Sequence, residues 1–129
     1  MTASLPGHDP VAVFEQACAE GRLVYQQCGH CDSVQVYPRT HCARCHRAAL
    51  QWRRSAGRGT LLSHTTVHRA ASPQFQQRTP YVLALVAVDE GFRLMMHIDP
   101  LRPLAIGDAV EIGFVIDADG RARLEGTVR

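Results

Sequence analysis

The hydrophobic positions of this chain follow two different periods, and the change from one to the other falls near Gly59. Before that point, Asp9 and Pro10 have the character of an N-cap and a first helical residue. They predict a helix that ends before Gly21. Its apolar face consists of three residues, Val11, Phe14 and Cys18. Since about eleven residues do not hold a helix alone in water, we expect this helix to pack on its own chain or on a partner.

After Gly59 the pattern changes to a period of two, which is that of strands, and the segment at 81–88 is apolar on both faces. The pattern predicts five strands, at residues 61–68, 81–88, 92–98, 110–116 and 122–128. In the third strand Leu94 and Met96 would face inwards while Met95 would face outwards. No helical period separates these strands, so the fold class is mainly β, and a five-stranded OB-fold barrel is the expected architecture. An SH3-like barrel is the alternative.

Between the helix and the strands lie two Cys-x-x-Cys pairs, in the stretch CGHCDSVQVYPRTHCARC. Their sulfurs belong to Cys28, Cys31, Cys42 and Cys45. In a zinc ribbon each such pair sits in a tight turn that aims two thiolates at one point, and two turns complete a tetrahedron. Asp32 and His46 follow the pairs where the chain often turns through positive φ, and both residue types are enriched there. The spacing therefore predicts a rubredoxin-like zinc ribbon.

Two other interpretations of the cysteines are weaker. A thioredoxin-like redox site would open a helix after a buried strand, whereas Val24, Tyr25 and a turn at Pro38 flank these pairs. Structural disulfides are the least favoured interpretation, because we expect a reducing compartment, where disulfides are rare. Four thiolates leave no open coordination position, so we expect one structural Zn²⁺ per chain with no catalytic chemistry. A histidine could replace a cysteine as ligand, and three histidines adjoin the pairs: His30, His41 and His46.

Composition and charge narrow the functions further. All 14 basic side chains are arginine, which excludes a lysine Schiff base. Residues 22–58 carry seven arginines and one aspartate, a local balance of +6 against an overall charge of +2, and this basic segment contains the cysteine pairs. The first ten residues lack the pattern of a signal peptide. Since the longest apolar run is far shorter than the roughly 20 residues that span a bilayer, we expect a cytoplasmic protein without a membrane segment.

Several segments, in their order along the chain, resemble those of one protein family. They are the capped helix, LVYQQCGHCDSVQVYPRTHCARC, SAGRGTLLSHTTVH, TPYVLALVAVDEGFRL and LAIGDAVEI. Over residues 9–128 the chain resembles the zinc-ribbon and OB-fold family of acyl-CoA-associated proteins, long catalogued as domain of unknown function thirty-five. His41 and the Cys-Ala-Arg-Cys turn depart slightly from the family pattern. Together, pattern and resemblance divide the chain into an N-terminal helix (1–21), a zinc ribbon (22–56) and an OB-fold (57–129).

Members of this family occur beside, or bound to, thiolase-like enzymes, enoyl-CoA hydratase-like domains and acyl-CoA lyases. The resemblance implies a non-catalytic accessory subunit that binds a thiolase-like (or enoyl-CoA hydratase/aldolase) enzyme and helps to bind or channel acyl-CoA. CoA carries about four negative charges, for which arginine supplies planar two-point donors. The expected acyl-CoA or partner contacts lie in the basic segment and around the long loop at 69–80: Arg39, Arg53, Arg54, Phe75, Arg78 and Tyr81.

Two other functions stay open on the sequence. Zinc ribbons and OB-folds also bind single-stranded nucleic acid, but such sites stack bases on exposed aromatic residues. The outward positions expected on the barrel contain none: Arg93, Met95, His97, Glu111, Val115, Arg121 and Arg123. Free-standing catalysis would rest on His64 and His68, which share one face of a strand, yet no serine or cysteine nucleophile stands at a strained turn. We therefore expect no enzymatic activity from this chain alone.

Overall fold

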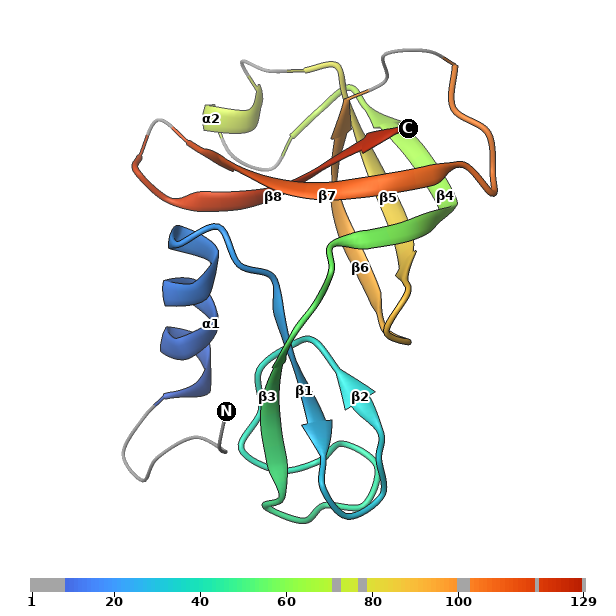
Figure 1. Ribbon diagram of the computed structural model, residues 1–129. Helices are drawn as coiled ribbons and strands as arrows, with labels where there is room; N and C mark the ends of the chain where they lie inside the picture. Colours follow the sequence, from blue (N-terminus) through green and yellow to red (C-terminus); the bar gives the residue numbers. More distant parts are fainter. Residues whose placement is uncertain (1–8, 71–72, 77–78, 100–102, 118, 129) are drawn as a thin grey trace.

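The computed structural model describes residues 9–70, 73–76, 79–99, 103–117 and 119–128, without the side chains of residues 74 and 75 (Figure 1). This part of the chain forms helices and strands in the following order: α1 (Pro10–Ala19), β1 (Val24–Cys28), β2 (Val34–Gln35), β3 (Leu50–Arg54), β4 (Arg58–Val67), α2 (Pro73–Gln76), β5 (Tyr81–Val88), β6 (Arg93–Asp99), β7 (Ala109–Ile116) and β8 (Ala122–Val128). None of its helices has the length and apolar character needed to cross a membrane.

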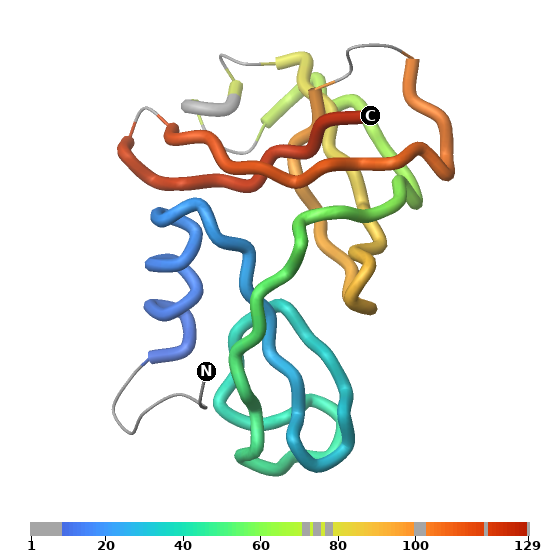
Figure 2. Tube along the Cα trace, in the orientation of Figure 1, coloured from blue at the N-terminus to red at the C-terminus, as the bar shows by residue number. Residues whose placement is uncertain are grey.

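The ribbon strands β1, β2 and β3 lie at one end of the molecule, and strands β4 to β8 lie at the other (Figure 1 and Figure 2). Helix α1 runs alongside the ribbon beneath the β7–β8 hairpin, and it contacts both β1 and β8. The chain passes from ribbon to barrel through the short connection between β3 and β4. The N-terminal helix therefore touches both halves of the structure.

Helix α1 begins and ends with the caps that the sequence predicts. The Asp9 carboxylate accepts a hydrogen bond from the Val11 N–H at 3.0 Å. At the other end Gly21 takes a φ of 77°, and the Arg22 N–H donates to the Ala17 carbonyl at 2.8 Å. A glycine in the left-handed region with this return bond is a Schellman-type stop. The predicted helix is confirmed at both ends.

The apolar face of α1 packs against its own chain except at Val11, which is 45% exposed. Ala17 is buried together with Val24 and Trp52, and Phe14 packs on this cluster and on the main core. Cys18 is buried as well, and burial raises the pKa of its thiol. Of the two alternatives that the sequence left open, the helix therefore takes intramolecular packing, and Cys18 behaves as a small apolar residue.

Strands β1, β2 and β3 form an antiparallel sheet in the order β2-β1-β3. Its two faces meet different neighbours. Val24 of β1 turns towards α1, whereas Tyr25 turns towards the barrel, where its ring centroid lies 5.0 Å from that of Phe92. The helix thus covers one face of the ribbon sheet, and the turn between β5 and β6 covers the other.

Strands β4 to β8 close into a barrel in the order β4-β5-β6-β8-β7, and β7 pairs back onto β4. The pairs are antiparallel except for β6 and β8, which run parallel through residues 97–99 and 125–127. This Greek-key arrangement of five strands is that of the OB-fold. The predicted OB-fold is therefore confirmed, and the SH3-like alternative is excluded.

The strand bounds agree closely with the predicted ranges, except that β4 begins at Arg58 rather than at residue 61. The additional residues, 58–60, pair with β7. A Cβ at Gly59 would lie 2.5 Å from the Ala87 carbonyl oxygen, so only glycine allows β4 to approach β5 this closely. A shift of register between Leu61 and Ser63 then marks a β-bulge, a feature that bends a strand and helps a sheet to close.

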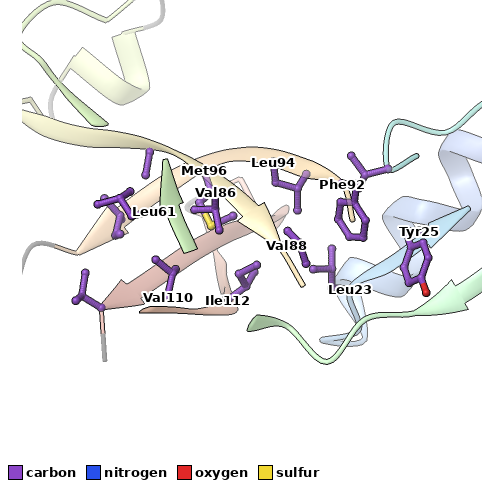
Figure 3. Close-up of a cluster of buried hydrophobic side chains, with 14 residues drawn as sticks. Leu23, Tyr25, Leu61, Val86, Val88, Phe92, Leu94, Met96, Val110 and Ile112 are labelled. Carbon is purple, nitrogen blue, oxygen red and sulfur yellow. The ribbon is translucent and has the colours of Figure 1, made fainter. Parts of the chain in front are cut away.

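The main hydrophobic core runs from the barrel into the ribbon without a break (Figure 3). Inside the barrel, the predicted alternation of β6 is confirmed by the burial of Leu94, Met96 and Ile98. Ala84, Val86 and Val88 of β5 are buried in the same core. From the ribbon side, Leu23, Tyr25 and Val36 join the same cluster next to Phe92. Ribbon and barrel therefore share one core, and loss of structure in one removes packing from the other.

Candidate functional site

The four cysteine sulfurs of the ribbon converge on one point, within 4.8 Å of one another. The Sγ atom of Cys28 lies 3.6 Å from that of Cys45, and the Sγ atom of Cys31 lies 3.6 Å from that of Cys42. Sulfurs placed tetrahedrally at about 2.3 Å from Zn²⁺ are about 3.8 Å apart, whereas a disulfide needs about 2.05 Å. The spacing of the sulfurs fits a zinc ion and not a pair of disulfides.

Two turns of the same design hold these sulfurs. The Asp32 N–H donates to the Cys28 carbonyl at 3.0 Å, and the His46 N–H donates to the Cys42 carbonyl at 2.9 Å. Asp32 and His46 take φ values of 64° and 66°, so the predicted positive φ is confirmed at both positions. Four backbone N–H groups, those of residues 30, 31, 44 and 45, point at the Cys28 and Cys42 sulfurs with N···S distances of 3.3 to 3.5 Å. Such bonds favour the thiolate form that a metal ion requires.

Without a bound cation, three of the thiols, those of Cys31, Cys42 and Cys45, have shifted pKa values. Hydrogen bonds from the side chain and backbone of Ser33 lower the pKa of Cys31 to about 6. The Cys45 N–H lowers the pKa of Cys42. The Arg47 backbone acts to lower the pKa of Cys45, but burial and the neighbouring sulfurs outweigh it and raise that pKa to about 11. A divalent cation at the centre would offset the repulsion among thiolates, so metal binding would favour deprotonation of Cys45, whose pKa is raised.

Cysteines alone make up the metal-ligand group found in the described residues. His41 has its Nδ1 atom 3.0 Å from the Thr40 hydroxyl, and the side chains of His30 and His46 are exposed. Cys28 and Cys42 are buried against Leu50, which screens that side of the site from water. Four thiolates complete the coordination of zinc, so the ion stabilises the ribbon and offers no open position to water or substrate.

The described residues among the predicted acyl-CoA or partner contacts lie in two parts of the structure. Arg39, Arg53 and Arg54 have exposed side chains on the ribbon. Tyr81 begins β5, whereas Val88, at the other end of that strand, shares a core cluster with ribbon residues. Two further predicted contacts, Arg78 and the side chain of Phe75, lie outside the described residues. The arginines and Tyr81 therefore face different surroundings, and their roles stay predictions.

A shallow groove of about 400 Å³ runs between the ribbon and the barrel. Residues 34–37, Arg39 and Ala43 line it from the ribbon, and residues 91–93 line it from the turn that enters β6. The sequence pattern placed Arg93 on the outside of the barrel, where it is exposed, but gave no sign that it shares a groove with Arg39. This groove is one feature of the site that sequence reasoning missed.

Gln26, a side chain only 1% exposed in the middle strand of the ribbon, fixes the backbone of Arg39. Its Nε2 donates to the Arg39 carbonyl at 2.9 Å, and its Oε1 accepts the Arg39 N–H at 2.9 Å. The Gln35 amide donates to the same Oε1 at 3.2 Å and accepts the Ala43 N–H at 3.1 Å. These two glutamines hold the loop between the cysteine pairs. The sequence signal for this was that Gln26 stands two residues from Val24 and two from Cys28, on the same face of the strand as both, where a polar side chain needs hydrogen-bond partners.

The outer face of the barrel carries an aromatic contact that the sequence analysis also missed. The Tyr81 ring stacks on the His97 imidazole, with centroids 4.6 Å apart and planes at 16°. Met95 is 58% exposed on the same strand as His97. His64 and His68 are exposed, and neither belongs to the metal-ligand group of the described residues. The predicted outward positions of β6 are thus confirmed, but an aromatic ring accompanies them.

A capped helix, a ribbon with four converging sulfurs and a Greek-key barrel define a zinc-ribbon and OB-fold protein. Family models agree with both parts. The rubredoxin-like zinc ribbon domain of ChsH2 matches residues 16–51, and the C-terminal OB-fold domain of ChsH2 matches residues 52–115. The chain belongs to this family of DUF35 proteins, as the resemblance implied, and the single structural zinc ion of the ribbon fits its four cysteines.

The chain is similar in sequence to scaffold proteins and to a hydratase subunit. DUF35 domain-containing scaffold proteins of Methanothermobacter thermautotrophicus and Methanocaldococcus jannaschii are 30% identical over 95 residues and 28% identical over 97 residues, covering 71% and 74% of this chain. A probable enoyl-CoA hydratase alpha subunit of Thermomonospora curvata is 32% identical over 108 residues, 84% of this chain. The chain spans 71% of the first relative, 65% of the second and 32% of the third.

Solved structures share the fold, among them the following two. A chain of the Ltp2-ChsH2(DUF35) aldolase superposes with a TM-score of 0.80 at 25% identity, over 97% of this chain and 98% of that one. A DUF35-family protein of unknown function from Sulfolobus solfataricus superposes with a TM-score of 0.64 at 14% identity, over 92% of this chain and 84% of that one. The second likeness bears on the fold alone.

Proposed function

We propose that this chain is a non-catalytic accessory subunit that binds a thiolase-like, enoyl-CoA hydratase-like or aldolase enzyme and helps to bind or channel its acyl-CoA. The observation that carries the proposal is the agreement, over 97% of the chain, with one chain of the Ltp2-ChsH2(DUF35) aldolase. The relatives that are named scaffold proteins support an accessory role. The relative named a hydratase subunit supports a link to CoA chemistry.

The predicted coordination of the metal ion supports the proposal that this chain is not itself the catalyst. A zinc ion with four thiolate ligands polarises no substrate and activates no water, because both need an open position. The ion instead holds two loops of the ribbon in place. We therefore assign the chemistry to the partner enzyme and the positioning of surfaces to this chain.

We assign the predicted contacts on the ribbon and those on the barrel to different parts of CoA or of the partner. Arg39, Arg53 and Arg54 carry positive charge on the ribbon, and we assign them to phosphate groups of CoA or to acidic groups of the partner. Tyr81 begins β5 of the barrel, and we assign it, together with Phe75 and Arg78, to the pantetheine arm or to the partner. If the partner enzyme lies between the ribbon arginines and Tyr81, one CoA molecule does not need to contact both.

Isothermal titration calorimetry with the thiolase-like enzyme that co-purifies with this chain tests the proposal. CoA should bind the complex more tightly than the enzyme alone, and replacing Arg39, Arg53 and Arg54 together by alanine should remove the gain. Arg121, an exposed arginine on the β7–β8 turn, provides the matched control as Arg121→Ala. Equal CoA affinity with and without this chain would reject the channel role. Turnover of an acyl-CoA by the isolated chain would reject the non-catalytic role.

Single-stranded nucleic-acid binding is the second candidate, and one observation favours it. The Tyr81 ring lies against His97 on the outer face of the barrel, where a base could stack. The overall charge of +2 gives little attraction to a phosphate backbone. We therefore expect no salt-dependent gel shift with oligonucleotides at submicromolar protein, and a shift that Tyr81→Ala abolishes would establish this function instead.

A further inference from the structure

We infer that the groove between ribbon and barrel docks an extended acidic segment of a partner protein. An apolar side chain of the segment would sit on the groove floor, and its carboxylates would meet the arginines at the rim. The inference rests on the proposed accessory role, because it names the kind of partner segment that such a subunit would hold.

The groove has an apolar floor and positively charged side chains at its rim. Its floor contains Val36 and Phe92, both part of the main core. At the rim Arg39 projects from the ribbon and Arg93 from the barrel, and Tyr37 is 62% exposed beside them. None of the described residues that line the groove is acidic. A segment that combines a carboxylate with an apolar side chain complements both features.

The ribbon presents a sheet edge at this groove. In the described part of the chain, β2 pairs with β1 alone, so it is the edge strand of the β2-β1-β3 sheet. Val34 and Gln35, which form β2, also line the groove. An extended peptide can add to such an edge through main-chain hydrogen bonds while alternate side chains enter the adjacent hollow. The groove is shallow, whereas sites for small molecules bury most of their ligand, which favours a peptide over a nucleotide.

The groove is formed before any partner binds. Gln26 holds the Arg39 backbone through two hydrogen bonds of 2.9 Å. On the opposite wall Gly91 takes a φ of 111°, and a Cβ there would lie 3.3 Å from the Val34 Cγ2 atom. The barrel turn therefore approaches the ribbon closely, and both walls are fixed. Fixed walls reduce the entropy lost on docking.

Nuclear magnetic resonance of the full, zinc-loaded chain tests this inference with a defined probe. The probe is a blocked hexapeptide of alternating glutamate and valine, and a lysine and valine hexapeptide is its counterpart. The acidic peptide should cause saturable amide shifts confined to residues 33–43 and 90–94. Arg39→Ala and Arg93→Ala should each weaken binding about tenfold, as loss of a charged hydrogen bond does, whereas Arg121→Ala should leave it unchanged. Arg39→Ala removes only the side chain, since Gln26 bonds the Arg39 backbone.

Three results would overturn the inference. They are the absence of saturable shifts, shifts centred elsewhere on the chain, and equal shifts with the lysine peptide. A parallel titration with CoA separates this inference from the proposed function. If CoA shifts the groove amides and the acidic peptide does not, the docking inference is wrong although the proposed function stands. If the peptide binds as expected and calorimetry shows no gain in CoA affinity, the groove is supported and the channel role is rejected.

Discussion

The Glu90 carboxylate, in the turn between β5 and β6, binds Ser55 on the connection from ribbon to barrel. The Ser55 hydroxyl donates to Glu90 Oε1 at 2.6 Å, and the Ala56 N–H donates to Oε2 at 2.8 Å. The Ser55 oxygen in turn accepts the Gly57 N–H at 3.0 Å. One carboxylate thereby ties the connection between the two sheets to the barrel. Together with the shared core, it fixes the ribbon relative to the barrel.

We predict that Glu90→Ala lowers the free energy of unfolding by about 2 kcal/mol, because two hydrogen bonds to a charged group are lost and the buried Ser55 hydroxyl is left without its acceptor. Urea denaturation followed by circular dichroism measures the change. Asp89→Ala is the matched control, since Asp89 is the exposed acidic neighbour in the same turn. An equal loss of stability in both variants would contradict the role of Glu90.

Removal of zinc should unfold the ribbon, residues 22–54, because small ribbons depend on metal binding worth on the order of 10 kcal/mol. Cys42→Ser should have the same effect, and the barrel should lose stability as well, since Leu23, Tyr25 and Val36 belong to its core. Elemental analysis and amide hydrogen exchange measure the two consequences. Cys18→Ala, which removes a cysteine outside the metal site, should retain one zinc per chain. Natively folded protein free of zinc would contradict the prediction.

Gln26→Leu should destabilise the fold by about 2 kcal/mol, because the Arg39 N–H and carbonyl would lose their partner in a buried place. The adjacent residue in the same strand, Gln27, is half-buried and provides the control as Gln27→Leu. Thermal unfolding of zinc-loaded protein gives the comparison. Similar melting temperatures for the two variants would show that the Gln26 bonds contribute little.

Gly59→Ala should prevent the barrel from closing, because the new Cβ would lie 2.5 Å from the Ala87 carbonyl oxygen and 2.7 Å from the Val86 Cγ1 atom. We expect a loss of about 3 kcal/mol or more, since backbone must move to relieve the clash. Gly113→Ala is the control in β7, because its nearest atom would be the Glu125 carbonyl oxygen at 3.8 Å. The yield of folded protein and the melting temperature test the pair. Equal tolerance of both changes would refute the close approach at Gly59.

Features that depend on residues close together in the sequence were predicted well. The N-cap at Asp9 and the positive φ at Asp32 and His46 follow from local backbone chemistry, and the structure shows all three. The alternation in β6, with Met96 buried and Met95 exposed, follows from the pleat of a single strand. The doubled Cys-x-x-Cys spacing likewise determined the metal site, because each turn needs only its own few residues to aim two sulfurs.

Only the tertiary structure decided which distant segments meet. Arg39 and Arg93 line one groove because the barrel turn packs against the ribbon, and no local pattern contains that contact. The same holds for Glu90 and Ser55, which are separated by 35 positions. The stacking of Tyr81 on His97 likewise joins residues from two strands, β5 and β6. Hydrophobic patterns fix the face on which a residue lies, whereas sheet register and barrel closure fix its neighbours.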